Sequence, residues 1–342
     1  MGIISRTANA VIKINDKNVT KDLMPYLISM EYTDKSDDEL DDLQIVLDDR
    51  EKKFQSYWMP KIGSKITASI LTKHWKKLGD EEKIECGDFE VDEIELAVSF
   101  QGGDIVTIKA LPAVVKSSLM QQKKTRYWEN VPMVQVIADI AGEAGLDTYY
   151  KAPDIVFVRV EQREEHDLEF LQRICKEQGL RLCLKKGKII VYMGQTADAT
   201  PPIKFERKLF DFGQINFKHT MNDIYKQCVV GYTDPNDSET KKADFTPQDQ
   251  PGTGKTLTIN QRVEDPAQAE RIGIAALRDK NSREYTGSFS GMGDTRLIAG
   301  KTIELKGFNK FDMKYVIKQV SHKIDFNNGY TVDVEFEKAL EY

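Results

Sequence analysis

Residues 89–110 read FEVDEIELAVSFQGGDIVTIKA, and residues 315–336 read YVIKQVSHKIDFNNGYTVDVEF. The two stretches align without a gap, and their apolar residues coincide at Phe89/Tyr315, Val91/Ile317, Ile94/Val320, Val98/Ile324, Phe100/Phe326, Val106/Val332 and Ile108/Val334. Alternation of apolar and polar residues is typical of a strand with one buried face. We therefore expect the chain to build one β-hairpin twice.

The turns of the two copies support this interpretation. Gln101-Gly102-Gly103-Asp104 and Asn327-Asn328-Gly329 both offer residues that accept the positive φ angles of a tight reversal. A shorter match, GSKI at 63–66 and GKTI at 300–303, precedes the hairpins. A chain that builds one small β-unit twice presents two near-equivalent surfaces, and this suits symmetric assembly better than catalysis.

Length and composition limit the class of protein. At 342 residues, with 40% hydrophobic and 30% charged residues, the chain is expected to be soluble and to form two or three domains. It has no uninterrupted apolar run of about 18 residues, which a membrane-spanning helix needs, and no secretory signal at its N-terminus. The net charge of −6 argues against a dedicated nucleic-acid-binding protein.

Cysteine and histidine spacings indicate neither a metal site nor a disulfide framework. The cysteines match no zinc pattern and stand at Cys86, Cys175, Cys183 and Cys228. We expect four reduced thiols in a protein made in the cytoplasm. The histidines lie outside metal-ligand spacing of one another, and His322, inside the second hairpin, is expected on a sheet face.

The hydrophobic pattern divides the chain into three domains. Residues 5–112 are β-rich, and residues 113–200 form a compact α/β insert. Residues 201–342 return to β structure, with one helix and a long exposed loop at 232–254. Composition alone does not say how these parts assemble.

Three helices are expected from apolar residues at helical spacing. The first begins after Pro132 and ends at Gly145, and its buried face is expected to hold Val134, Ile137, Ala138 and Ala141. The second runs over about 167–178. The third begins with Asp265 as its N-cap and Pro266 as its first residue.

The sequence GTGKT at 252–256 resembles the end of a phosphate-binding loop. The pattern requires a glycine where Asp249 stands, and a carboxylate there would repel a phosphate. It also requires a helix after the lysine, whereas residues 257–259 look extended. We therefore expect no nucleotide and no other cofactor.

Other charged segments are expected to be solvated surface. The acidic run at 34–49 lacks the central glycine of a calcium loop. The basic stretches at 73–77 and 116–126 are short and flanked by acids. No residue stands out as catalytic or metal-binding, so we expect a protein without enzymatic activity.

Several segments resemble a known family in their order and spacing. They are LQIVLDDREKKFQSYWMPKIGSKITASI (43–70), CGDFEVDEIEL (86–96), YWENVPMVQVIADIAGEAGL (127–146), VEQREEHDLEFLQRICKEQGLRL (160–182) and GKTIELKGFNKFDMKYVIKQVSHKIDFNNGYTVDVEF (300–336). The likeness covers nearly the whole chain and is to the late control D family of phage tail proteins, the baseplate hubs of contractile tails. The chain is also similar to the N-terminal hub part of the valine–glycine-repeat spike proteins of type VI secretion, another contractile injection system.

The resemblance implies an α+β, mainly β fold in which 5–112 and 201–342 are two similar β-barrel-like tube domains, separated by the α/β insert. It implies a homotrimer whose six tube domains form a pseudo-sixfold ring between a tail tube and a central spike. The implied partners are further copies of the chain, a tail spike protein, a tail tube or tube-initiator protein and baseplate wedge proteins. We expect no membrane and no specific nucleic acid as partner.

The implied location is the baseplate of a virion or phage-tail-like particle, assembled in the bacterial cytoplasm. The type VI relatives continue into a spike-forming region, whereas this sequence stops at Tyr342. A separate spike protein is therefore expected, which favours a phage or phage-tail-like particle over a type VI spike. An infectious phage and a bacteriocin-like particle both remain open.

In such a ring the hairpins would line a channel, with one face toward the domain core. Leu96, Val98 and Phe100 of the first copy, and Ile324 and Phe326 of the second, are expected to face the core. The opposite faces, toward the lumen or a neighbouring module, are expected to hold Glu95, Ala97, Ser99, Gln101, Lys323, Asp325 and Asn327.

Two other functions remain open at this point. One is a tail-associated cell-wall hydrolase, because carboxylates are plentiful and glycoside cleavage needs a pair of them. The other is a nucleotide-driven assembly factor that would use the loop at 252–256. Both have weaker support in the sequence than a structural hub.

Overall fold

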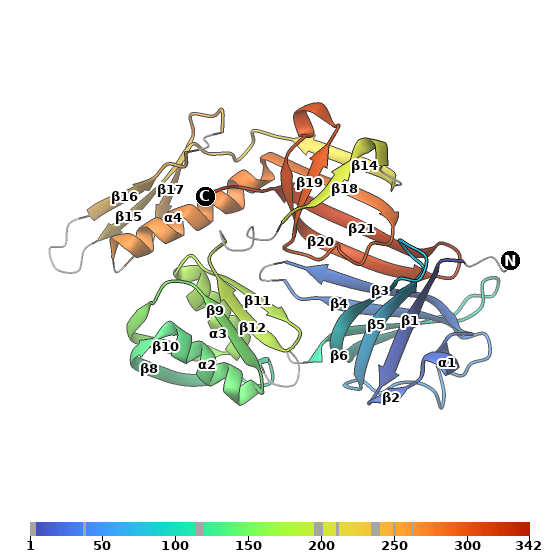
Figure 1. Cartoon of the computed structure of the whole chain (residues 1–342). Coiled ribbons are helices and arrows are strands. Elements are labelled where there is room, and N and C mark those ends of the chain that lie inside the picture. Colours follow the sequence, from blue (N-terminus) through green and yellow to red (C-terminus); the bar gives the residue numbers. More distant parts are fainter. Residues whose placement is uncertain are drawn as a thin grey trace.

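The computed structural model describes residues 5–36, 39–113, 119–194, 201–209, 212–233, 240–248, 251–261, 263 and 265–342. Strands hold 50% of the chain and helices 18%, which confirms the mainly β fold class. Figure 1 shows a large sheet, a separate green insert, and a lobe of three strands packed on helix α4. No helix in the described ranges is long and apolar enough to cross a membrane.

The first half of the large sheet comes from the N-terminal part of the chain. Its elements are β1 (Thr7–Ile14), β2 (Lys17–Asn18), α1 (Thr20–Leu23), β3 (Leu27–Lys35), β4 (Asp42–Asp48), β5 (Lys65–Lys73), β6 (Glu81–Ala97) and β7 (Ile105–Pro112). Strands β3, β4, β7, β6 and β5 follow one another in this order, and every neighbouring pair is antiparallel. We call these five strands the first module.

The second half of the sheet comes from the C-terminal part. Its elements are β13 (Ile203–Glu206), η3 (Arg207–Leu209), β14 (Phe212–His219), η4 (Ser282–Glu284), β18 (Tyr285–Met292), β19 (Thr302–Lys306), η5 (Asn309–Phe311), β20 (Lys314–Asp325) and β21 (Gly329–Lys338). Strands β14, β18, β21, β20 and β19 are antiparallel neighbours in this order. We call them the second module.

The two modules match strand for strand and pair for pair. The β6–β7 pairs, from Phe89–Pro112 to Ala97–Ile105, correspond one by one to the β20–β21 pairs from Tyr315–Lys338 to Lys323–Thr331. The β-bulges coincide as well. The register of each hairpin shifts shortly after its first pair, between Val91 and Glu93 in the first copy and between Ile317 and Gln319 in the second. The hairpin repeat expected from the sequence is therefore part of a five-strand repeat.

Other details of the two modules coincide as well. The β3–β4 and β14–β18 pairs both bulge near their first residue, between Leu27 and Ser29 and between Phe212 and Gln214. Gly63 and Gly300 both have φ +81°, and each donates its N–H to the first strand of the repeated hairpin, to Val91 of β6 and to Ile317 of β20. Positive φ is a conformation that glycine adopts without strain, which explains the shared GxxI match.

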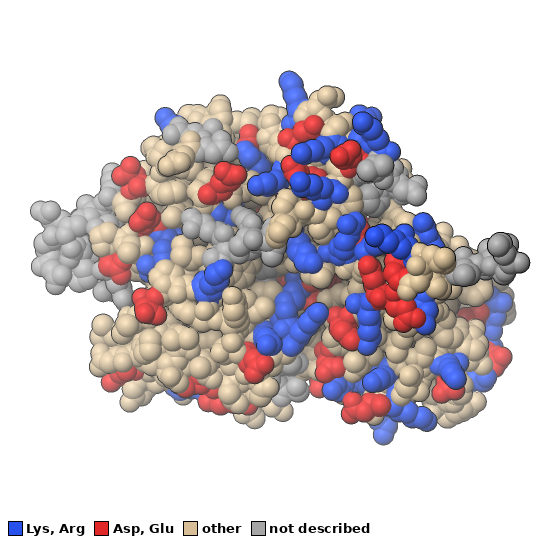
Figure 2. Space-filling view, in the orientation of Figure 1, with Lys and Arg blue, Asp and Glu red and all other residues tan. Residues whose placement is uncertain are grey.

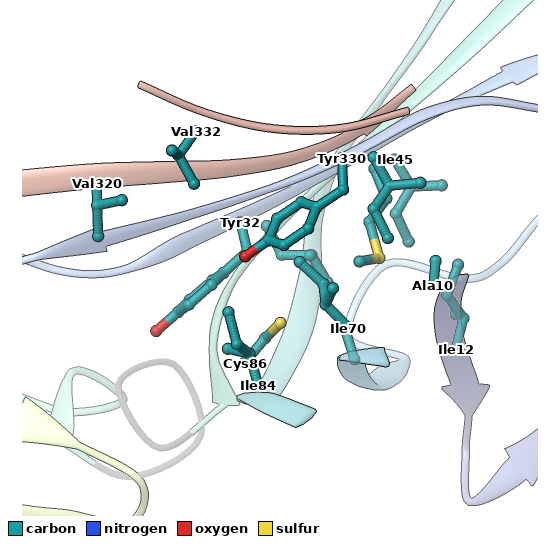
Figure 3. Close-up of a cluster of buried hydrophobic side chains, with 14 of the residues drawn as sticks. Ala10, Ile12, Tyr32, Ile45, Ile70, Ile84, Cys86, Val320, Tyr330 and Val332 are labelled. Atoms are coloured by element: carbon teal, nitrogen blue, oxygen red, sulfur yellow. The ribbon is translucent and has the colours of Figure 1, made fainter. Parts of the chain in front are cut away.

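One joint fuses the modules into a single sheet. Strand β20 pairs with β19 only through its first residues and then, from Gln319 to Asp325, with β3. The buried apolar residues of both modules form one cluster. Figure 3 shows Tyr330, Val320 and Val332 of the second module gathered with Tyr32 and Cys86 of the first. Burial of such side chains contributes roughly 1.5–3 kcal/mol each.

The insert has its own apolar core. Its elements are β8 (Lys124–Pro132), α2 (Met133–Ala144), β9 (Asp147–Lys151), β10 (Val156–Glu165), α3 (Asp167–Glu177), β11 (Arg181–Lys185) and β12 (Lys188–Tyr192). Helix α2 ends at Gly145 with φ +70°, as expected, and buries Ile137 and Ala141. The expectation for Val134 was wrong, because this side chain is exposed and Val136 takes the inward position.

The remaining lobe is inserted between β14 and β18. Its elements are β15 (Gln227–Thr233), β16 (Thr240–Phe245), β17 (Thr256–Asn260) and α4 (Pro266–Asn281). Asp265 caps α4 as expected, since its side chain accepts a 2.8 Å hydrogen bond from Gln268 N. The stretch at 232–254 is not one continuous loop, because β16 pairs antiparallel with β15. The small residues and prolines at 196–202 are typical of a linker, and this stretch lies outside the described residues up to position 200.

Candidate subunit interface

The two repeated hairpins have the same internal geometry but different surroundings. In the second copy, β21 lies on one side of β20 and β3 lies on the other. The cross-strand pair of His322 and Tyr32 stacks with its ring planes 12° apart. Ile324 is only 7% exposed, which confirms that it faces the core.

His322 is an integral part of this covered hairpin. One ring nitrogen lies 2.8 Å from the Tyr330 hydroxyl and the other 3.0 Å from the Leu297 carbonyl oxygen. Burial lowers the pKa of His322 to about 4, although the nearby Asp34 carboxylate acts in the opposite direction. The imidazole is therefore neutral at pH 7 and serves packing and hydrogen bonding.

In the first copy, the corresponding strand edge is bare. The pairing of β6 with β5 ends at Glu90, so within the described part of the chain residues 93–97 have only β7 beside them. Val98 is 69% exposed, Leu96 is 43% exposed and Phe100 is fully exposed. The prediction that these three side chains face the core is wrong for the single chain, because the hairpin extends past the last strand that could cover it. Phe326, at 87% exposed, also departs from the expected inward position.

The residues expected on the opposite face all lie on the two hairpins and do not form one cluster. Glu95, Ser99 and Gln101 are exposed on the first hairpin, and Asn327 is exposed at the second turn. Lys323 and Asp325 are half-buried on β20. Several of them also shape the turns: Ser99 Oγ accepts from Gly102 N at 3.1 Å, and Asp325 Oδ1 accepts from Asn327 N at 2.7 Å.

The bare edge is negatively charged. Lys109 Nζ lies 2.9 Å from Glu95 Oε1 and 3.3 Å from Glu93 Oε2, so one cation faces two carboxylates. The hydrogen bond from Lys109 lowers the pKa of Glu95, and the same bond raises the pKa of Lys109. Elsewhere on the face in Figure 2, charges of both signs are interspersed over the sheet.

A buried ion cluster fixes the insert against the first module. Lys185 Nζ of β11 contacts both Asp34 of β3 and Asp41. Asp34 also accepts from Ala299 N at 2.9 Å. Burial alone would lower the pKa of Lys185, but the two carboxylates outweigh it and raise that pKa. The expectation that the acidic run at 34–49 is solvated was therefore wrong for Asp34 and Asp41, because their cation comes from a distant segment that the local pattern does not place beside them.

The structure also shows the surroundings of the loop at 252–256, of the cysteines and of the metal-binding side chain types. Lys255 is followed by strand β17 instead of a helix, as expected from the extended look of residues 257–259. The four cysteines are buried and are not joined in disulfides. No group of three metal-binding side chains comes together among the described residues. The unpaired edge of β6, with its exposed apolar side chains, is therefore the candidate interface.

Comparison with known proteins shows which proteins this chain resembles. No family model matches the sequence. The "Probable baseplate hub protein" of Escherichia phage 186 is 23% identical to this chain over an alignment of 380 positions, gaps included, which covers 96% of this chain and 92% of that protein. Sequence similarity over both whole lengths confirms the resemblance to the baseplate hub proteins of contractile tails.

Solved structures show the same fold. The 43 kDa tail protein of prophage MuSo2 from Shewanella oneidensis superposes with a TM-score of 0.70 at 13% identity, over 97% of this chain and 98% of that chain. The E. coli c3393 protein, a component of the type VI secretion system, superposes with a TM-score of 0.56 at 13% identity, over 92% of this chain and 74% of that chain. The fold is therefore shared by phage tail and type VI secretion proteins.

Proposed function

We propose that this chain is the structural baseplate hub of a contractile tail or phage-tail-like particle. The observation that carries the proposal is the duplicated five-strand module, matched in register and in its bulges, in a chain similar over its whole length to a baseplate hub protein. A duplicated module lets one chain meet partners of two different symmetries. The candidate interface has a role in assembly that needs no catalytic residue.

The proposed assembly is a homotrimer. Residues 5–112 and 201–342 act as the two tube domains, and residues 113–200 are the insert. Three chains then give six similar modules, enough to seat a sixfold tail tube on one side and a threefold spike on the other. The proposed partners are a tail tube or tube-initiator protein, a spike protein and baseplate wedge proteins, and the proposed location is the baseplate, assembled in the bacterial cytoplasm.

Neither alternative function gains support. None of the relatives reported above is named as a hydrolase. The loop at 252–256 leads into a strand, so it lacks the helix N-terminus that a phosphate-binding loop uses. A purely structural role is the simplest account of the molecule.

The test is the mass of the purified chain in solution, alone and with a spike protein from the same particle. We expect a trimer that binds the spike, measured by light scattering after size exclusion and by native mass spectrometry. A chain that stays monomeric at high concentration, with and without the spike, would contradict the hub. The control is a tail protein from an unrelated particle, which should not bind this chain.

A further inference from the structure

The two strands that join the modules within one chain, β20 and β3, each have a matching strand whose edge is unpaired. This joint pairs residues 319–325 of β20 antiparallel with residues 29–35 of β3, from Gln319 opposite Lys35 to Asp325 opposite Ser29. In the strand-by-strand match, β6 takes the place of β20 and β14 takes the place of β3. The chain therefore carries a second set of both halves of the joint.

Both halves of the second set are free edges. In the described ranges β6 has no neighbour beyond β7 after Val91, and β14 pairs only with β18. Free edges expose unpaired N–H and C=O groups and are usually blocked by proline or a bulge. No proline occurs at 93–99 or 214–219, and no bulge interrupts either edge within the paired parts of these stretches.

We propose that β6 of one copy pairs with β14 of a second copy and thereby repeats, between chains, the joint that β20 and β3 make within each chain. The inference rests on the hub function proposed above and deepens it by naming the contact. The β20–β3 register, carried onto the matched strands, sets Leu96 opposite Phe217 and Val98 opposite Ile215 on one face. On the other face it sets Glu95 opposite Lys218, Ala97 opposite Asn216 and Ser99 opposite Gln214.

The apolar face of this pairing buries what the single chain exposes. Phe217 and Ile215 lie on β14 and already pack against the apolar core that the two modules share. A hollow of about 400 Å³ lies against them and is lined also by Phe308 and Phe311. The covered counterpart shows the result to expect, because Ile324 is 7% exposed where its match Val98 is 69% exposed.

The polar face is complementary in charge. Glu93 and Glu95 share a single cation, Lys109, on the bare edge of β6. Lys218 is exposed on β14, and none of the ion pairs between described residues includes it. Opposite charges directly across two strands favour the pairing, whereas like charges oppose it. The two edges also differ from each other, so each copy offers one edge of each kind and a head-to-tail ring results.

The test is a disulfide across the proposed joint in the full-length chain. Residues directly opposite each other in an antiparallel pair have Cβ atoms about 4.5–5.5 Å apart, close to the range of a disulfide. Oxidation of an Ala97→Cys/Asn216→Cys chain should link neighbouring copies covalently on a non-reducing gel. Glu31→Cys/Lys323→Cys, which lie opposite each other within one chain, is the positive control and should give an intrachain bond.

A displaced pair and a charge swap complete the experiment. Glu95→Cys/Asn216→Cys is offset by two residues, about 7–8 Å, and should link at least ten times more slowly. Glu95→Lys should weaken self-association at least tenfold, and adding Lys218→Glu to it should restore most of the loss. A variant that merely misfolds would not be restored in this way.

The outcomes separate the contact from the function. An oligomer in which the Ala97→Cys/Asn216→Cys pair fails to link, while the positive control closes, overturns the strand pairing and leaves the hub function standing. Equal linking of the displaced pair also overturns the proposed register. A strict monomer, alone and with the spike, overturns both the pairing and the hub.

Discussion

Single residues differ between the modules where their surroundings differ. Position 96 of the first hairpin is leucine, and its match in the second is His322, which is buried and bonded on both ring nitrogens. A histidine can be buried only with partners for its polar atoms. The chain therefore uses one backbone plan with side chains adapted to a covered and an uncovered edge.

His322 should make stability depend on pH. Its pKa is about 4 in the folded chain against 6.5 when unfolded, so the unfolded chain binds the extra proton. Stability from this residue is full above pH 6.5 and falls by about 3 kcal/mol as the pH drops to 4. Denaturant titrations from pH 4 to 7.5 measure this slope.

A His322→Leu chain provides the comparison. It should be about 1–3 kcal/mol less stable at pH 7, because the Tyr330 hydroxyl and the Leu297 carbonyl lose their partner. Its stability should depend less on pH between 4 and 6.5. An unchanged slope would show that other groups cause the acid sensitivity.

At the scale of elements, close backbone contacts and buried ions hold the insert in place. The C-terminus of α3 approaches the backbone of α4 at Gly179, where a Cβ atom would lie 2.6 Å from the Arg271 carbonyl oxygen. Lys185 binds the insert to Asp34 of β3 and to Asp41, just before β4. Both contacts join segments that are far apart in the sequence.

The contact at Gly179 predicts opposite effects of alanine at two glycines. Gly179→Ala should cost more than about 1 kcal/mol, because φ is +69° and the new methyl group meets backbone atoms. Gly142→Ala, in α2 with nothing within 4 Å, should stabilise by about 0.5–1 kcal/mol. Thermal unfolding compares them, and equal shifts would refute the close approach.

Lys185→Met should destabilise the chain by about 3 kcal/mol, because it leaves Asp34 and Asp41 buried without their cation. Lys186→Met, in the exposed turn that follows, should stay within about 0.5 kcal/mol of the native chain. Denaturant unfolding of both variants is the measurement. Similar stabilities would mean that the ion cluster does not fix the insert.

At the scale of the whole molecule, the two modules provide matched positions, so that a substitution in one module serves as the control for the same substitution in the other. Val98 and Ile324 are matched positions, one exposed and one buried. Ile324→Ser should destabilise the folded chain by at least about 2 kcal/mol. Val98→Ser should leave folding within about 0.5 kcal/mol but weaken self-association, as measured by sedimentation. The reverse pattern would refute the assignment of the two edges.

The sequence predicts the mainly β fold, the hairpin repeat and the helix ends, since local periodicity and turn residues determine them. Prediction from the sequence fails for features that depend on contacts between distant segments. The polar stretch TKKADF becomes β16 because β15 pairs with it, against its weak local preference. The facing of Leu96 and Val98 was wrong because it depends on a covering strand that the chain does not place there.

Since both modules lie in one chain, any closed circle of such chains holds an even number of them. Joints within a chain and joints between chains would then alternate around the circumference. The decorations alternate too, because the insert follows the first module and the β15–β17 lobe interrupts the second. The inner wall of such a circle would therefore repeat twice as often as its outer rim, and one gene product would meet two different rotational orders.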